Sequence, residues 1–206
     1  EKEKERAFLM NGSAKPLSQR LILSALLICL IALAHAHRPT VSDSPEARVA
    51  RRYQAQVSEL SAYDQTLGGA LDLNLEDETG SIKTLSSYRG QVVLLNFWAS
   101  WCPPCIKEMP DLEGLAQDMR GLPFKLVALS ADDDWAAIQR VMGSQDLSME
   151  VYRDPSLKDK QHLRYGTEKH PETYVVDKQG RLRLRFISVQ PWRDEELMSY
   201  LEWLAQ

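Results

Sequence analysis

An apolar run that leads into two closely spaced cysteines constrains the fold of this chain more than any other feature. Residues 92–98 are almost continuously apolar and rich in β-branched and aromatic side chains, which predicts a strand buried on both faces. Cys102 and Cys105 follow almost immediately. Apolar residues then recur at helical steps of three and four: Ile106, Met109, Leu112, Leu115, Ala116 and Met119. A strand, a Cys-x-x-Cys motif and a helix in this order are typical of a dithiol redox site.

The positions of the two cysteines suit this chemistry. Cys102 is expected at the mouth of the helix, where unpaired backbone N–H groups and the helix dipole favour a thiolate over a thiol. Pro103 and Pro104 would occupy the first helical positions, where a missing N–H costs little. Cys105 lies one turn on, within reach of a disulfide. We therefore predict that Cys102 is the attacking sulfur and Cys105 the resolving one.

The segment from Asn96 to Pro110 resembles the active-site region of the TlpA-like (ResA-like) thiol–disulfide oxidoreductases of the thioredoxin superfamily. The resemblance runs from about Leu71 to the C-terminus. It implies an α/β thioredoxin-like fold, with a mixed central sheet flanked by helices, an N-terminal β-hairpin and a strand–helix insertion. It also implies an extracytoplasmic enzyme that reduces disulfides of exported proteins, such as apocytochrome c in cytochrome c biogenesis. A membrane thiol-electron donor would recycle it, and no cofactor is expected.

The resemblance also assigns roles to residues outside the Cys pair. It implies that the bond before Pro171 is cis and that this proline faces the cysteines and binds an extended substrate segment. His170 precedes it, either as an imidazolium that favours the Cys102 thiolate or, by default, as a solvent-exposed side chain without a catalytic role. Glu108 lies one helical turn after Cys105, where a carboxylate can move the resolving cysteine's proton. Trp101 is expected at the surface, in contact with substrate.

Other functions fit the motif less well. A structural zinc site needs four ligands, and the third cysteine, Cys29, lies in an apolar run far from the pair. Cys102, Cys105 and His170 would suit copper, although copper-delivering thioredoxin-fold proteins usually space their cysteines one residue wider. A disulfide oxidase or isomerase stays open, because the Pro-Pro dipeptide does not fix the reduction potential. The peroxidatic Thr-x-x-Cys pattern is missing around Cys102, and a net charge of −4 argues against nucleic acid as a partner.

The N-terminal part of the sequence indicates export. Residues 21–34 are apolar apart from one serine, and Ala34-His35-Ala36 fits a small-x-small cleavage site. The run is shorter than the roughly 20 residues of a membrane-spanning helix, yet a family resemblance of this kind often brings an uncleaved anchor. Met10 is a candidate start residue. We expect residues 1–36 to be a signal peptide or membrane anchor, 37–69 a partly helical linker, and 70–206 the thioredoxin-like domain.

The sequence also predicts three features outside the cysteine motif. The weak apolar face at residues 47–60 is interpreted as part of a solvated tether rather than a docked helix. Asp132, Asp133 and Asp134 are interpreted as a solvated cap for the helix that follows them, since no further carboxylates follow at calcium-loop spacing. His162 is expected to be a surface residue.

Overall fold

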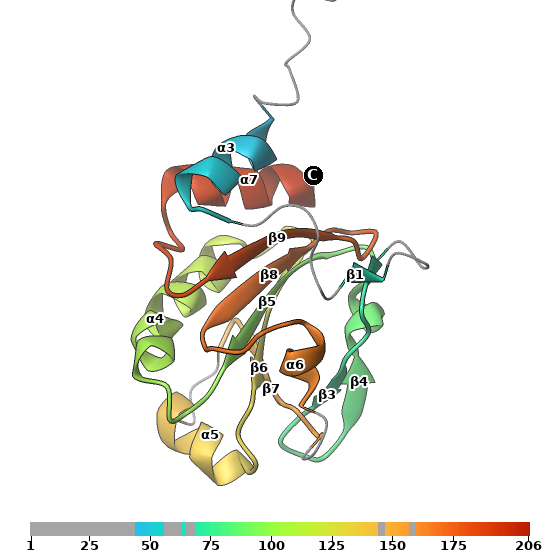
Figure 1. Cartoon of the computed structure of the whole chain (residues 1–206), viewed down its shortest axis with the longest axis vertical. Coiled ribbons are helices and arrows are strands. Elements are labelled where there is room, and N and C mark those ends of the chain that lie inside the picture. The colour runs from blue at the N-terminus through green and yellow to red at the C-terminus, as the bar shows by residue number, and fades with distance from the viewer. Residues whose placement is uncertain (1–43, 56–62, 65–68, 144–146, 157–159) are drawn as a thin grey trace, which may run out of the picture. The chain divides into compact units, whose positions relative to one another are not determined.

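A seven-stranded mixed sheet forms the centre of the part of the chain that the computed structural model describes, namely residues 44–55, 63–64, 69–143, 147–156 and 160–206 (Figure 1). Its strand order is β4-β3-β7-β6-β5-β8-β9. The strands are β3 Asn74–Glu76, β4 Ile82–Thr84, β5 Val92–Trp98, β6 Phe124–Ser130, β7 Glu150–Arg153, β8 Glu172–Val176 and β9 Leu182–Ile187. Strands β5, β6 and β7 are parallel, whereas β8, β9 and the β3–β4 hairpin pair antiparallel with their neighbours. Two short strands, β1 Tyr63–Asp64 and β2 Gly69–Ala70, pair separately.

Helices alternate with the strands and cover the sheet. They are α3 Pro45–Arg52, the 3-10 helix η2 Leu85–Tyr88, α4 Pro103–Asp118, α5 Trp135–Met142, α6 Gln161–Arg164 and α7 Glu195–Ala205. The predicted mixed sheet with flanking helices is therefore confirmed, as is the N-terminal hairpin, β3–β4. Along the sequence, α5, β7 and α6 come after β6 and before β8. They include the expected inserted strand and helix.

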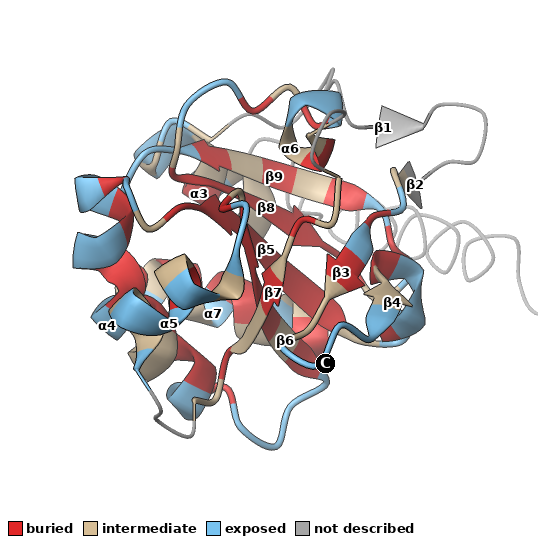
Figure 2. Ribbon diagram, turned by 90° about the horizontal axis from the view of Figure 1, so that it is seen from below, coloured by how far each residue is buried: buried red, intermediate tan, exposed pale blue. Residues whose placement is uncertain are grey.

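Strand β5 lies between β6 and β8, and all seven of its residues are buried (Figure 2). Because successive side chains point to opposite faces, the strand contributes to two hydrophobic cores. Val92, Leu94 and Trp98 pack with α3, α4, α5 and α7, whereas Val93, Leu95 and Phe97 pack with side chains from the hairpin, η2 and the α6 region. This double burial explains why residues 92–98 are so uniformly apolar.

Helix α3 differs from the expected solvated tether. Ser44 caps it by accepting a hydrogen bond from the backbone N–H of Ala47, and Pro45 begins its first turn. Val49 is fully buried in the core, and the helix packs against α7 and β9. The hydrophobicity pattern showed the apolar face but not the surface that covers it. The sequence C-terminal to residue 55 in this spacer lies mostly outside the described residues.

The predicted export segment, residues 1–36, lies outside the described residues. Within the part that is described, no helix is both long and apolar enough to cross a membrane.

Candidate active site

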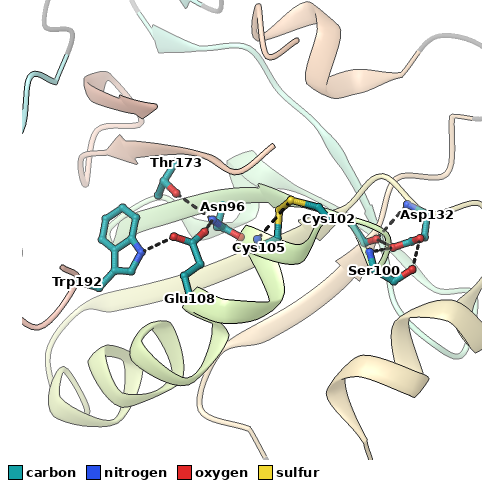
Figure 3. The surroundings of a disulfide bond; sticks show 9 residues. Asn96, Ser100, Cys102, Cys105, Glu108, Asp132, Thr173 and Trp192 are labelled. Carbon is teal, nitrogen blue, oxygen red and sulfur yellow. Dashed lines mark hydrogen bonds between the residues drawn. A yellow bond between two sulfur atoms is a disulfide. The ribbon is translucent and has the colours of Figure 1, made fainter. Parts of the chain in front are cut away.

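A disulfide joins Cys102 and Cys105 at the beginning of α4, with 5.3 Å between their Cα atoms (Figure 3). Strand β5 ends at Trp98, and a short loop brings the chain to Cys102, the N-cap residue. Pro103 and Pro104 then form the first helical positions, as their missing N–H groups allow. Cys105 is fully buried, whereas Cys102 keeps 5% of its surface exposed. Cys102 is thus the less buried residue of the pair.

The backbone around Cys102 favours negative charge on its sulfur. The N–H of Cys105 donates a hydrogen bond to Sγ of Cys102 over 3.3 Å. Sγ therefore occupies the N-cap position, where the positive end of the α4 dipole lies. When the disulfide is reduced, both effects lower the free energy of the Cys102 thiolate relative to its thiol.

Asp132 fixes the loop that precedes the cysteines. Its carboxylate accepts hydrogen bonds from the N–H of Ser100 at 2.8 Å, the hydroxyl of Ser100 at 2.7 Å and the hydroxyl of Ser130 at 2.6 Å. The expectation of a solvated acidic triplet is thus wrong for Asp132, which is buried. It is correct for the cap itself, because Asp134 accepts from the N–H of Ala137. The sequence shows three adjacent carboxylates but not which one points inward.

Glu108 is also buried, with 1% of its surface exposed, on the turn of α4 that follows Cys105 (Figure 3). Its Oε1 accepts from Nδ2 of Asn96 at 3.0 Å, and its Oε2 accepts from Nε1 of Trp192 at 2.9 Å. Burial raises the pKa of Glu108 to about 7, and these two donors with the backbone N–H of Gln190 oppose that rise. Such a carboxyl group can hold or release a proton near neutral pH.

Asn96 links Glu108 to β8, the strand that begins directly after Pro171. It lies opposite Thr173 in the β5–β8 register, and its Nδ2 also donates to Oγ1 of Thr173 at 2.9 Å. Its Oδ1 is buried and has no hydrogen-bond partner among the described residues. A polar residue in an otherwise apolar strand was the only sequence signal for this role. Trp192 gave no signal, because it lies 84 positions after Glu108 in a loop.

The predicted substrate-binding residues lie close together. The His170–Pro171 peptide bond is cis, as the resemblance implied, and β8 begins directly after it. The indole of Trp101 is 67% exposed, and its ring centroid lies 5.6 Å from that of His170. His162 is half-buried rather than at the surface, with its ring centroid 4.9 Å from that of His170.

The surroundings of His170 agree with neither of the two interpretations of its role. It is half-buried and therefore not the freely exposed side chain of the default interpretation. Burial, with a contribution from His162, lowers the pKa of His170 to about 4. This imidazole is therefore neutral at neutral pH, which disfavours the proposed imidazolium. Among the described residues, no group of three or more His, Cys, Asp or Glu side chains is arranged to hold a metal ion.

The chain is similar to a protein family and to individual proteins of known sequence. Residues 68–185 match the model of the AhpC/TSA family. The thiol-disulfide oxidoreductase ResA of Bacillus cereus is 31% identical over 126 residues, which cover 61% of this chain and 70% of that protein. The thioredoxin-like protein YneN of Bacillus subtilis is 33% identical over 116 residues, 54% of this chain and 65% of that protein.

Solved structures show the same fold. A structure assigned as a thiol:disulfide interchange protein DsbE from Chlorobium tepidum aligns with a TM-score of 0.59 and 24% identity, covering 73% of this chain and 100% of that one. The exposed lipoprotein thioredoxin of Streptococcus pneumoniae aligns with a TM-score of 0.52 and 25% identity, covering 65% and 99%.

Proposed function

The chain belongs to the AhpC/TSA family and is a ResA-like thiol–disulfide oxidoreductase, and from this premise we propose that it reduces disulfides of exported proteins outside the cytoplasm. The observation that carries the proposal is the Cys102–Cys105 disulfide at the beginning of α4, in which Cys105 is fully buried and Cys102 keeps 5% of its surface exposed. Disulfide-containing proteins are the substrates that this chemistry requires.

The proposed reaction is two successive thiol–disulfide exchanges. The Cys102 thiolate attacks one sulfur of the substrate disulfide, a mixed disulfide forms, and the first substrate sulfur leaves as a thiolate. Cys105 loses its proton and attacks Sγ of Cys102, which breaks the mixed disulfide and releases the second substrate sulfur. The substrate gains two electrons and, after protonation, two thiols, while the enzyme is left with the disulfide that the structure shows.

Glu108 is proposed to accept the proton that Cys105 loses. Cys105 is fully buried, so water does not serve as a ready base for its thiol. Glu108 lies one helical turn away on the buried side of the same helix. Its pKa of about 7 leaves a large fraction ionised at neutral pH, yet makes it a strong enough base to take a proton there.

The substrate is proposed to bind across Trp101, His170 and Pro171. The exposed Trp101 indole offers an apolar contact beside the reactive sulfur. The carbonyl of Pro171 already accepts a hydrogen bond from the N–H of Ser188. The backbone on the His170 side of the cis bond is therefore the part proposed to pair with an extended substrate segment, as in strand addition.

The proposals on export, substrate and reductant follow from the resemblance to ResA-like proteins. We propose that residues 1–36 export the domain or anchor it to the membrane, that 37–69 link it, and that 70–206 form the catalytic domain. Apocytochrome c is the proposed substrate and a membrane thiol-electron donor the proposed reductant. A measured reduction potential tests the direction of transfer, since a value more negative than about −270 mV, that of thioredoxin, supports a reductant. A value near about −120 mV, that of a strong oxidant, would reverse the assignment.

Trapping in cells tests the substrate class. Cys105→Ala should accumulate mixed disulfides between Cys102 and exported proteins, because the resolving thiol is missing. Cys102→Ala is the matched control and should trap none. Adducts restricted to cytoplasmic proteins, or equal adducts in both variants, would overturn the proposal.

A further inference from the structure

Helix α3 is bound to the catalytic domain by ion pairs as well as by its apolar face. Glu46 forms a bidentate pair with Arg183 of β9, with distances of 2.6 and 2.9 Å, and both side chains are largely buried. Arg52, at the other end of the helix, pairs with Asp194 and Glu196 at 3.0 Å each. Figure 1 shows α3 lying across α7 and next to β9. The helix is thus held at both ends.

Tyr53, directly after α3, contacts two parts of the catalytic domain. Its hydroxyl donates a hydrogen bond to the carboxylate of Asp194, the residue that caps α7. Its ring packs edge-on against Phe186 of β9, with 6.4 Å between centroids. The N–H of Asp194 in turn donates to the carbonyl of Pro191 at 2.9 Å. Tyr53 therefore holds both ends of the connection between β9 and α7.

Trp192 lies within that connection and is fully buried. Its ring packs edge-on against Phe186, with 5.5 Å between centroids, and its Nε1 donates to Oε2 of Glu108 over 2.9 Å (Figure 3). Contacts therefore run without a break from Tyr53 through Phe186 and Trp192 to Glu108. A phenylalanine could supply the ring packing at 192, but only the indole N–H can donate to the carboxylate.

We propose that Trp192 is a positioning residue for Glu108, and that helix α3 holds Trp192 in place through Tyr53. The proposal rests on the proposed role of Glu108 as the base for Cys105. It makes the segment that precedes the catalytic domain a part of the active site, since docking of α3 sets the geometry of the carboxylate. A hydrogen bond from the indole stabilises the ionised carboxylate, which is the form that accepts a proton.

Other groups also act on Glu108 and must be kept constant in any test. Asn96 of β5 and the backbone N–H of Gln190 donate to the carboxyl group, and Asp111, on the next turn of α4, opposes its ionisation. In the reduced protein, Cys105 is a further titratable group on the same helix. A substitution at 192 or 53 leaves all four of these residues unchanged.

The test uses the full chain and measures the proton affinity of Glu108 directly. The ¹³Cδ resonance of Glu108 is followed against pH in the oxidised protein, for the wild type, Trp192→Phe, Tyr53→Phe and the control Trp203→Phe. Trp203 is 47% exposed on α7 and stacks on Tyr200, so Trp203→Phe makes the same change of side chain away from the site. Trp192→Phe should raise the midpoint of the Glu108 titration by about one pH unit, and Tyr53→Phe should raise it by less. Trp203→Phe should leave it unchanged.

The resolving step provides a second readout. Its rate is measured against pH in the same variants and in Glu108→Gln. If Glu108→Gln leaves the profile unchanged, the proposed role of Glu108 fails, while the resonance still reports on Trp192. If Glu108→Gln alters the profile but Trp192→Phe leaves both readouts at wild-type values, the positioning role is wrong.

Two further outcomes are decisive. A wild-type midpoint in Tyr53→Phe would overturn the part assigned to α3. Should Trp192→Phe not fold, benzothienylalanine at position 192 keeps the shape of the indole without its N–H. A wild-type midpoint in that protein would overturn the part assigned to Trp192.

Discussion

Glu108→Gln replaces a buried ionisable carboxyl group by a neutral amide of the same shape, and we expect it to change how stability depends on pH. In the folded protein the pKa of this carboxyl group is about 7, whereas in an unfolded chain its pKa has the ordinary value of 4.5. Unfolding between these values therefore releases a proton, and rising pH favours the unfolded state. The glutamine variant lacks this ionisable group, so its unfolding does not release this proton.

The magnitude follows from the two pKa values. A difference of about 2.5 pKa units corresponds to about 3 to 4 kcal/mol, because each unit is worth about 1.4 kcal/mol. The wild type should therefore lose about 3 to 4 kcal/mol relative to Glu108→Gln between about pH 4 and 8, most of it between pH 4.5 and 7, with no further relative change above about pH 8. The glutamine oxygen can keep the hydrogen bond from Trp192, and its NH₂ group can donate to Oδ1 of Asn96 once the Asn96 amide turns over.

Urea unfolding of the oxidised proteins at a series of pH values measures this difference. Both proteins contain the same remaining titratable groups, so subtracting the two curves isolates the contribution of Glu108. A difference in unfolding free energy that stays constant between about pH 4.5 and 7 would refute the reasoning. It would show that the Glu108 carboxyl group has an ordinary pKa in the folded protein.

Three other contacts give separate predictions. Asp132→Ala should lower the free energy of unfolding by about 2 kcal/mol, because Ser100 loses its buried acceptor. Urea unfolding measures this change, and an unchanged unfolding midpoint would contradict the role given to the hydrogen bonds between Asp132 and Ser100. Val49→Ala should cost about 1.5 kcal/mol if α3 is docked, and nothing if it lies in solvent. In the oxidised protein the ring resonances of His170 should not titrate between about pH 5.5 and 8, and a midpoint near 6.5 would show that the imidazole is solvated.

Features that lie within one element were predictable from the sequence. The apolar run of β5, the helical period of α4 and the spacing of Cys102 and Cys105 each depend on neighbours a few residues away. The place of Glu108 one turn after Cys105 follows from the same spacing. The cis bond before Pro171 was available only through the family resemblance, because sequence alone gives X-Pro bonds a weak preference for cis.

Contacts between distant elements were not predictable. Trp192 reaches Glu108 because of where β9 ends and α7 begins, and no local pattern encodes that geometry. Asp132 is buried because β6 ends next to the loop that holds Ser100, whereas its two acidic neighbours face elsewhere. The burial of Val49 likewise depends on a surface formed by β9 and α7. His162 was assigned to the surface for the same reason, since the sequence does not show its neighbour, His170.

The division of labour between the two sulfurs is the central claim, and a stopped-flow reaction of the reduced protein with 5,5′-dithiobis(2-nitrobenzoate) tests it most directly. The wild type should release the coloured thiolate twice, first when Cys102 forms the mixed disulfide and again when Cys105 resolves it. Cys105→Ala should release it once and retain the adduct on Cys102, whereas Cys102→Ala should react slowly. Fast reaction of Cys102→Ala, with the adduct on Cys105, would contradict the account.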